Sequence, residues 1–196
     1  DSFIIFTTNG LYRVGQDGKV LSKKLLNDLP QVKEDGYGIA VPGLSIYFSV
    51  YSFFGFDASK GVVALPLYSY EEDATGEYAK KVLVISCDDW SIRNEVEIDC
   101  PDIIKKEGDM QLLSCINVLP HGDWLIYNFP ASSKVYVYDL SVKKSKEYDF
   151  PSTFTDPFFH LPDINGSEPG FGCLKTGYYF PLCYDAYHDV FWRVQQ

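Results

Sequence analysis

The chain has 196 residues, of which 46% are hydrophobic and 22% charged, so it has the composition of a globular domain and enough length to bury a core. It carries 17 Lys and Arg against 27 Asp and Glu, and the resulting net charge of −10 argues against a surface for nucleic acid or anionic membranes, because both need a basic patch. Aromatic residues make up 16% of the chain, which favours β structure. The first residue is not Met, and we expect the native N-terminus to be missing.

The N-terminal segment predicts three short strands, at residues 3–8, 11–14 and 20–26. Asn9 and Gly10 separate the first two strands, and Asp17 and Gly18 separate the second and the third. Asn-Gly and Asp-Gly are strong hairpin signals because both turn positions tolerate positive φ. These strands fit only the last part of a repeat unit made of four consecutive antiparallel strands.

A stretch without charge, residues 36–56, is long enough to raise the question of a membrane span. Its apolar residues alternate with polar ones over 45–56, which is the period of a strand, so we expect no transmembrane helix. Further strands are predicted at 62–70, 82–87 and 92–98. An acidic loop at 71–77 follows the strand at 62–70. The best helical candidate, at 101–107, is only about two turns long.

The clearest pattern lies at residues 112–150. It predicts strands at 115–119, 124–129, 134–139 and 144–150, separated by turns rich in Pro, Gly and Asp. The C-terminal segment predicts three more strands, at 170–174, 178–184 and 190–195, as the first, second and third of their unit.

Four consecutive antiparallel strands in about 40 residues are the repeat unit of a β-propeller blade. We therefore predict an all-β fold, one partial β-propeller domain over residues 1–196, with approximate blades at 1–29 (partial), 37–100, 111–150 and 170–196 (partial). A closed propeller needs about four to eight blades, so missing blades or a second chain would have to close the ring. The alternative is a β-sandwich made from the same strands.

Two segments carry a family resemblance: residues 129–140 (FPASSKVYVYDL) and 184–193 (YDAYHDVFWR). They resemble the N-terminal half of a domain-of-unknown-function family of TolB-like, six-bladed propeller lipoproteins from gut Bacteroidetes. In that family the second segment usually reads Tyr-Asp-x-Tyr-Arg-x-Val-Tyr-Tyr-Arg. Here His188 replaces the first arginine, and Phe191 and Trp192 replace two tyrosines. The resemblance implies an exported protein of the cell envelope, a periplasmic or outer-membrane lipoprotein, and carries no catalytic residue across.

No motif for catalysis, a metal or a cofactor stands out. The chain has no G-x-S-x-G elbow, phosphate-binding loop or G-x-G-x-x-G. We interpret His121 as a solvated turn residue. The pair Asp88 and Asp89 is interpreted as part of a turn and not as the two acids of a glycoside hydrolase. Residues 163–168 match a calcium-binding loop only weakly. The five cysteines show no C-x-x-C spacing, and a Cys100–Cys115 disulfide is less favoured than buried free thiols. We therefore assign no catalytic residue, metal site or cofactor.

Loop length points to one face of the predicted propeller as the binding face. The turns after the first and third strands of each unit are short, whereas the other face receives the segments 27–36, 71–80, 101–109 and 151–171, and long loops on a rigid scaffold are where binding usually resides. Aromatic rings beside carboxylates suit a carbohydrate or a peptide. The candidate ligand-binding residues are Asp156, Phe158, Phe159, His160, Asp163, Tyr187 and His188.

These observations favour a non-catalytic binding or scaffold protein of the cell envelope, with ligand or partner recognition on the long-loop face. The alternative is an enzyme that acts on glycans and uses loop carboxylates as acid and base.

Overall fold

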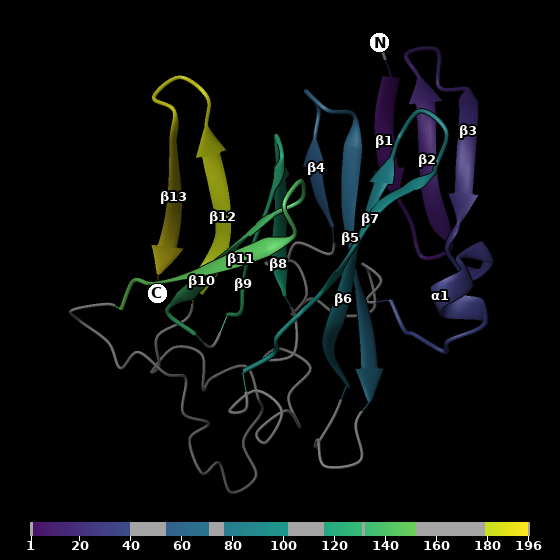
Figure 1. Cartoon of the computed structure of the whole chain (residues 1–196). Coiled ribbons are helices and arrows are strands. Elements are labelled where there is room, and N and C mark those ends of the chain that lie inside the picture. Colours follow the sequence, from purple (N-terminus) through teal and green to yellow (C-terminus); the bar gives the residue numbers. More distant parts are fainter. Residues whose placement is uncertain are drawn as a thin grey trace, which may run out of the picture.

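The computed structural model describes residues 2–39, 54–70, 77–101, 116–130, 132–151 and 179–195. Within these residues the chain forms four antiparallel sheets, which follow one another in sequence order (Figure 1). Each strand pairs with the next strand along the chain, so every sheet is an up-and-down meander. We number the sheets from first to fourth.

The first sheet contains β1 (Ser2–Phe6), β2 (Gly10–Gly15) and β3 (Val20–Leu25). The β2–β3 turn includes Gly18, whose φ of 78° lies in the left-handed region that favours glycine. Both hairpins predicted from Asn-Gly and Asp-Gly are therefore present.

Two short helices follow the first sheet where the sequence predicted only a loop: a 3-10 turn at Leu26–Asp28 and α1 at Pro30–Lys33. Pro30 occupies the start of α1, where its fixed φ fits and its missing N–H costs nothing. Leu26 and Leu29 are buried against the second sheet. One turn of helix is too short to show a helical period in the sequence.

The second sheet contains β4 (Gly55–Asp57), β5 (Val62–Tyr70), β6 (Glu77–Ser86) and β7 (Ile92–Glu97). Its two central strands are buried on both faces. Val63, Leu65 and Leu83 pack with the first sheet, whereas Ala64 and Val82 pack with the third. This double burial explains why β5 reads as an almost continuous apolar run.

The third sheet contains β8 (Asn117–His121), β9 (Trp124–Asn128), β10 (Lys134–Asp139) and β11 (Lys144–Asp149). The four strands predicted at 115–150 are present, with bounds that differ by no more than two residues. β11 is exposed along its whole length, as expected for a charged edge strand.

The fourth sheet contains β12 (Tyr179–Asp185) and β13 (Val190–Gln195). β12 contacts β8, in the same way as β8 contacts β4. β12 therefore takes the position that β4 and β8 have as the first strands of their sheets, whereas the sequence predicted residues 178–184 to be a second strand. The strand predicted before it, at 170–174, lies outside the described residues.

The predicted all-β class with antiparallel sheets is confirmed, and the described sheets do not form a closed ring. Of the strand predicted at 45–56, the structure describes residues 54–56, and β4 begins at Gly55. The helical candidate at 101–107 lies outside the described residues, apart from Pro101.

Candidate functional site

The turns that follow β2, β4, β6, β8, β10 and β12 lie at one end of the sheets, which we call the turn end (Figure 1). Contacts between side chains join turns of different sheets there. The amino group of Lys60, in the β4–β5 turn, lies 3.3 Å from the carboxylate of Asp123 in the β8–β9 turn. Arg13 of β2 lies 3.3 Å from Asp88 in the β6–β7 turn. The turn end is therefore where successive sheets meet through polar groups.

An Asp-x-Ser sequence occurs at three of these turns. In each, the aspartate accepts hydrogen bonds from the N–H and the hydroxyl of the serine two positions later, at 2.6 to 3.0 Å. The pairs are Asp57–Ser59, Asp89–Ser91 and Asp139–Ser141. The bonds from Ser91 are the main reason why the pKa of Asp89 falls to about 2, and those from Ser141 lower the pKa of Asp139. These Asx turns stabilise the conformations of the three turns.

Asp57 also caps a turn of the neighbouring sheet. Its second carboxylate oxygen accepts a hydrogen bond of 2.8 Å from the N–H of Gly122 in the β8–β9 turn. Burial acts to raise the pKa of Asp57, but the hydrogen bonds from the Ser59 hydroxyl and the backbone N–H groups outweigh it, and the pKa lies below its ordinary value. β8 ends with His121, where β4 and β10 end with the aspartates of their Asx turns, and Asp57 of the second sheet supplies the carboxylate that accepts from the N–H of Gly122.

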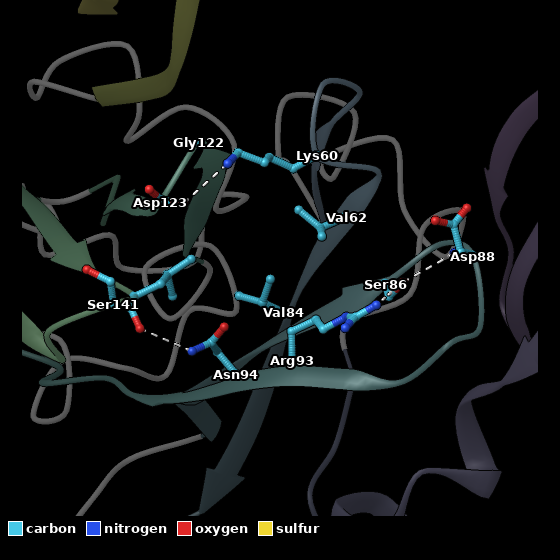
Figure 2. A pocket seen from close by; sticks show the side chains of 11 residues that line it. Lys60, Val62, Val84, Ser86, Asp88, Arg93, Asn94, Gly122, Asp123 and Ser141 are labelled. Carbon is cyan, nitrogen blue, oxygen red and sulfur yellow. Dashed lines mark hydrogen bonds and ion pairs between the residues drawn. The ribbon is translucent and has the colours of Figure 1, made fainter.

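A pocket of about 330 Å³ opens between the second and third sheets at this end (Figure 2). Its residues come from β5, β6, β7 and four of the turns. They are Lys60, Val62, Val84, Ser86, Asp88, Arg93, Asn94, Gly122, Asp123, Leu140 and Ser141. The volume lies at the lower end of the range for ligand pockets, roughly 300–1,000 Å³.

The pocket has an aliphatic floor and a polar rim. Val62, Val84 and Leu140 supply its methyl groups, and Val84 is almost fully buried. Asn94 of β7 donates a hydrogen bond of 3.4 Å to the carbonyl oxygen of Leu140, which joins the second sheet to the β10–β11 turn (Figure 2). The floor is thus held from both sheets.

The rim carries charged side chains on two sides of the floor, with both signs on each side. Figure 2 shows the amino group of Lys60 directed toward Asp123, while the guanidinium of Arg93 runs the other way, toward Ser86. Arg93 donates to the Ser86 hydroxyl at 3.2 Å and lies 3.9 Å from Asp89. The side chains of Lys60 and Arg93 are 49% and 56% exposed, and ion pairs this exposed contribute about 1 kcal/mol or less. Both cations are therefore available to a ligand.

A domain of unknown function, DUF4221, matches residues 2–196. The chain belongs to the DUF4221 family. A solved structure of a DUF4221 member from Bacteroides vulgatus ATCC 8482 is similar, with a TM-score of 0.57 and 14% identity, over 95% of this chain and 51% of that chain. The chain thus spans about half the length of that relative. No curated protein matches.

The expected membership in a domain-of-unknown-function family is confirmed by this match to DUF4221. The identity to the solved relative is too low to carry more than the fold, so site residues have to come from the geometry of this chain. The TolB-like propeller fold and the lipoprotein anchor remain predictions.

His121 is a packed residue, and the prediction of a solvated turn position is wrong. It ends β8, and its ring lies 4.0 Å from that of Tyr184 and 5.2 Å from that of Phe191, centroid to centroid. These contacts place the β12–β13 turn beside the β8–β9 turn. Its sequence neighbours Gly122 and Asp123 suggested exposure, because the rings that contact it come from the fourth sheet, more than 60 positions along the chain.

Tyr187 and His188, two of the candidate ligand-binding residues, lie in the β12–β13 turn at the turn end. Asp185 accepts hydrogen bonds from the N–H groups of both residues, and its second oxygen lies 2.6 Å from the ring of His188. Tyr187 is 89% exposed. The described contacts of these residues are those of another Asx turn, and they lie outside the pocket lining.

The other candidate ligand-binding residues, Asp156, Phe158, Phe159, His160 and Asp163, lie outside the described residues, as does the calcium-like segment 163–168.

The sequence analysis did not identify the pocket residues, because the argument from loop length pointed to the opposite face. The repeated Asp-x-Ser sequence was the available signal for them, since it marks the turns that surround the pocket.

The interface between the third and fourth sheets contains buried polar groups. Asn117, Asn128 and Tyr179 are almost fully buried, and side-chain atoms of each lack a hydrogen-bond partner among the described residues. Arg193 of β13 lies 4.2 Å from the Tyr179 ring and donates to the carbonyl oxygen of Ser133. This interface is therefore more polar than the apolar ones on either side of the second sheet.

Within the described part of the chain, no three His, Cys, Asp or Glu side chains gather as metal ligands. Cys87 and Cys100 are buried there, and burial is the main reason why the pKa of the Cys87 thiol rises to about 11. Cys115, the partner considered for Cys100, lies outside the described residues. Neither helix in the described ranges has the length and apolar composition that a membrane span requires.

Proposed function

We propose that this protein is a non-catalytic binding module and that its ligand occupies the pocket between the second and third sheets. The observation that carries the proposal is the pocket itself: an aliphatic floor and a rim of exposed charges, framed by turns that aspartate hydrogen bonds hold rigid. Rigid frames with a few polar groups around an apolar floor are typical of ligand sites.

We further propose that the four sheets are consecutive blades of a propeller. Three features support this fold over a sandwich: the sheets are successive meanders, the second sheet packs on both faces, and β4, β8 and β12 adjoin one another. A two-layer sandwich leaves no sheet in the middle. A location in the cell envelope, as a lipoprotein, is supported by the family resemblance of residues 129–140 and 184–193, and fractionation of native cells would test it.

The alternative of a glycan-acting enzyme finds less support in the described residues. A general acid in glycoside hydrolysis needs a carboxyl group whose pKa is raised. In the described residues, the carboxyl groups with a shifted pKa all shift downward: Asp17, Asp57, Asp89, Glu95, Asp139 and Asp185.

Thermal unfolding in the presence of two panels, oligosaccharides and short peptides, tests the proposed function, because a ligand that binds only the folded chain raises its Tm with concentration. We expect at least one compound to raise the Tm and to be recovered unchanged by mass spectrometry. Conversion of that compound into a product would favour the enzyme. No shift with either panel would contradict a binding function for this chain.

A further inference from the structure

We infer that the pocket binds a short peptide segment, which inserts one aliphatic side chain between the second and third sheets, pairs one flanking acidic group with Lys60 or Arg93, and pairs one flanking basic group with the carboxylate on the opposite side of the rim. The inference rests on the proposed function and names the class of ligand. Nothing in the family description assigns a ligand to this end of the sheets.

The floor of the pocket selects an aliphatic group. Val62 and Val84 point into the space from β5 and β6 (Figure 2). Leu140, in the β10–β11 turn of the third sheet, also lines it. Methyl groups from three directions match a Leu, Ile or Val side chain, whose burial removes apolar surface from water. None of the described lining residues is aromatic, so they do not provide the stacking platform that sugar recognition usually relies on.

The rim matches a main chain with charged neighbours. Lys60 and Asp123 stand on one side of the floor, and Arg93 and Asp88 on the other, so each side has both a cation and an anion, of which Asp88 also contacts Arg13. A peptide with an aliphatic residue between an acidic and a basic one presents complementary charges on both sides at once. Its amide groups can exchange hydrogen bonds with the side chains of Ser86, Ser141 and Asn94, which face the same space.

The size of the pocket limits the ligand. A volume of about 330 Å³ suits one side chain and the adjoining backbone, hence a segment of about two or three residues. Because the Asx turns hold the frame in place, little conformational entropy is lost when the segment binds.

Isothermal titration of the whole chain with four capped tripeptides tests the inference. The probes are acetyl-Glu-Leu-Lys-amide and acetyl-Lys-Leu-Glu-amide, each with a counterpart that has Gly in place of Leu, and cellobiose serves as the sugar probe. We expect one Leu peptide to bind, its Gly counterpart to bind at least tenfold more weakly, and cellobiose not to bind.

Variants locate the binding. Lys60→Ala and Arg93→Ala each remove one exposed cation from the rim, and we expect the one that faces the acidic flank to weaken binding of the Leu peptide about three- to tenfold. Lys19→Ala is the matched control, because Lys19 also follows a turn aspartate, Asp17, but lies at the β2–β3 turn, outside the pocket lining. An unchanged Tm of each variant shows that the fold is retained.

Four results would overturn the inference: equal binding of the Leu and Gly peptides, affinity unchanged in both rim variants, an equal loss in Lys19→Ala, or no binding of any peptide. Binding of cellobiose that Lys60→Ala weakens would also overturn the peptide ligand but would leave a binding function at this pocket. If none of the tripeptides nor cellobiose binds, and neither panel changes the Tm, the proposed binding function is contradicted as well.

Discussion

At the scale of single residues, Asp57 differs from the other aspartates that form Asx turns because it also accepts a hydrogen bond from a turn of another sheet. Asp57→Asn keeps an oxygen for the N–H groups of Ser59 and Lys60, but the amide nitrogen cannot accept the hydrogen bond from the N–H of Gly122. We expect the free energy of unfolding at neutral pH to fall by about 1–2 kcal/mol, as measured by urea denaturation. A loss too small to measure would mean that this hydrogen bond does not stabilise the contact between the sheets.

Asp139→Asn is the matched control for this prediction. Asp139 forms the same Asx turn, with Ser141, and it has no described hydrogen bond to another sheet. Asparagine forms Asx turns as readily as aspartate, so we expect this variant to lose clearly less stability than Asp57→Asn.

The pKa of Asp57 gives the same prediction a pH dependence. A carboxyl group whose pKa is lower in the folded than in the unfolded chain stabilises the fold above its unfolded pKa, and the contribution is lost as the pH falls through the folded pKa. Since the pKa of Asp57 lies below its ordinary 3.8, the stability difference between the original chain and Asp57→Asn should be full at pH 6 and shrink below pH 3.8. A difference that stays constant down to pH 2.5 would contradict an ionised Asp57 as the stabilising group.

At the scale of elements, the close approach of β4 and β8 depends on Gly55. A Cβ atom at this position would lie 2.4 Å from both the carbonyl oxygen of Val118 and the Cδ of Pro120. Gly55→Ala therefore forces two backbones apart, and we expect the free energy of unfolding to fall by about 1–3 kcal/mol. In Gly15→Ala the nearest atom is a carboxylate oxygen of the exposed Asp17, at 2.9 Å, which can rotate away. Chemical denaturation should show a clearly smaller loss for this control.

The strands could be predicted from the sequence because their signals are local. Alternation of apolar residues and turn pairs such as Asp17-Gly18 fix where a strand begins and ends, and the third sheet was predicted almost to the residue. The place of β12 could not be predicted in this way. Its contact with β8 joins residues some 60 positions apart, and no local pattern encodes it.

At the scale of the whole molecule, the pocket could not be predicted, because its residues are scattered from Lys60 to Ser141 and none belongs to a recognised motif. Loop length is a guide to function only when the long loops carry the site. Here short turns of two adjacent sheets enclose the described pocket, and their chemistry becomes visible only when the sheets are stacked. The repeated Asp-x-Ser turns were visible in the sequence, but they show which turns are rigid and not which of them meet.

The outer sheets of the stack predict self-association of this 196-residue chain. Phe3 is 60% exposed on β1, and Val190, Trp192 and Val194 are each about half exposed on β13, so an apolar sheet face lies at either end of the stack. In a propeller, such faces would pack on further blades. We expect the average mass from light scattering to rise above the monomer value with concentration, and Trp192→Lys to shift the curve toward monomer, because a charge opposes burial of this face. Val142→Lys is the control, since Val142 is 59% exposed but lies in the β10–β11 turn. A constant monomer mass would show that these faces do not associate, and an equal effect of both variants would assign the association to net charge instead of the β13 face.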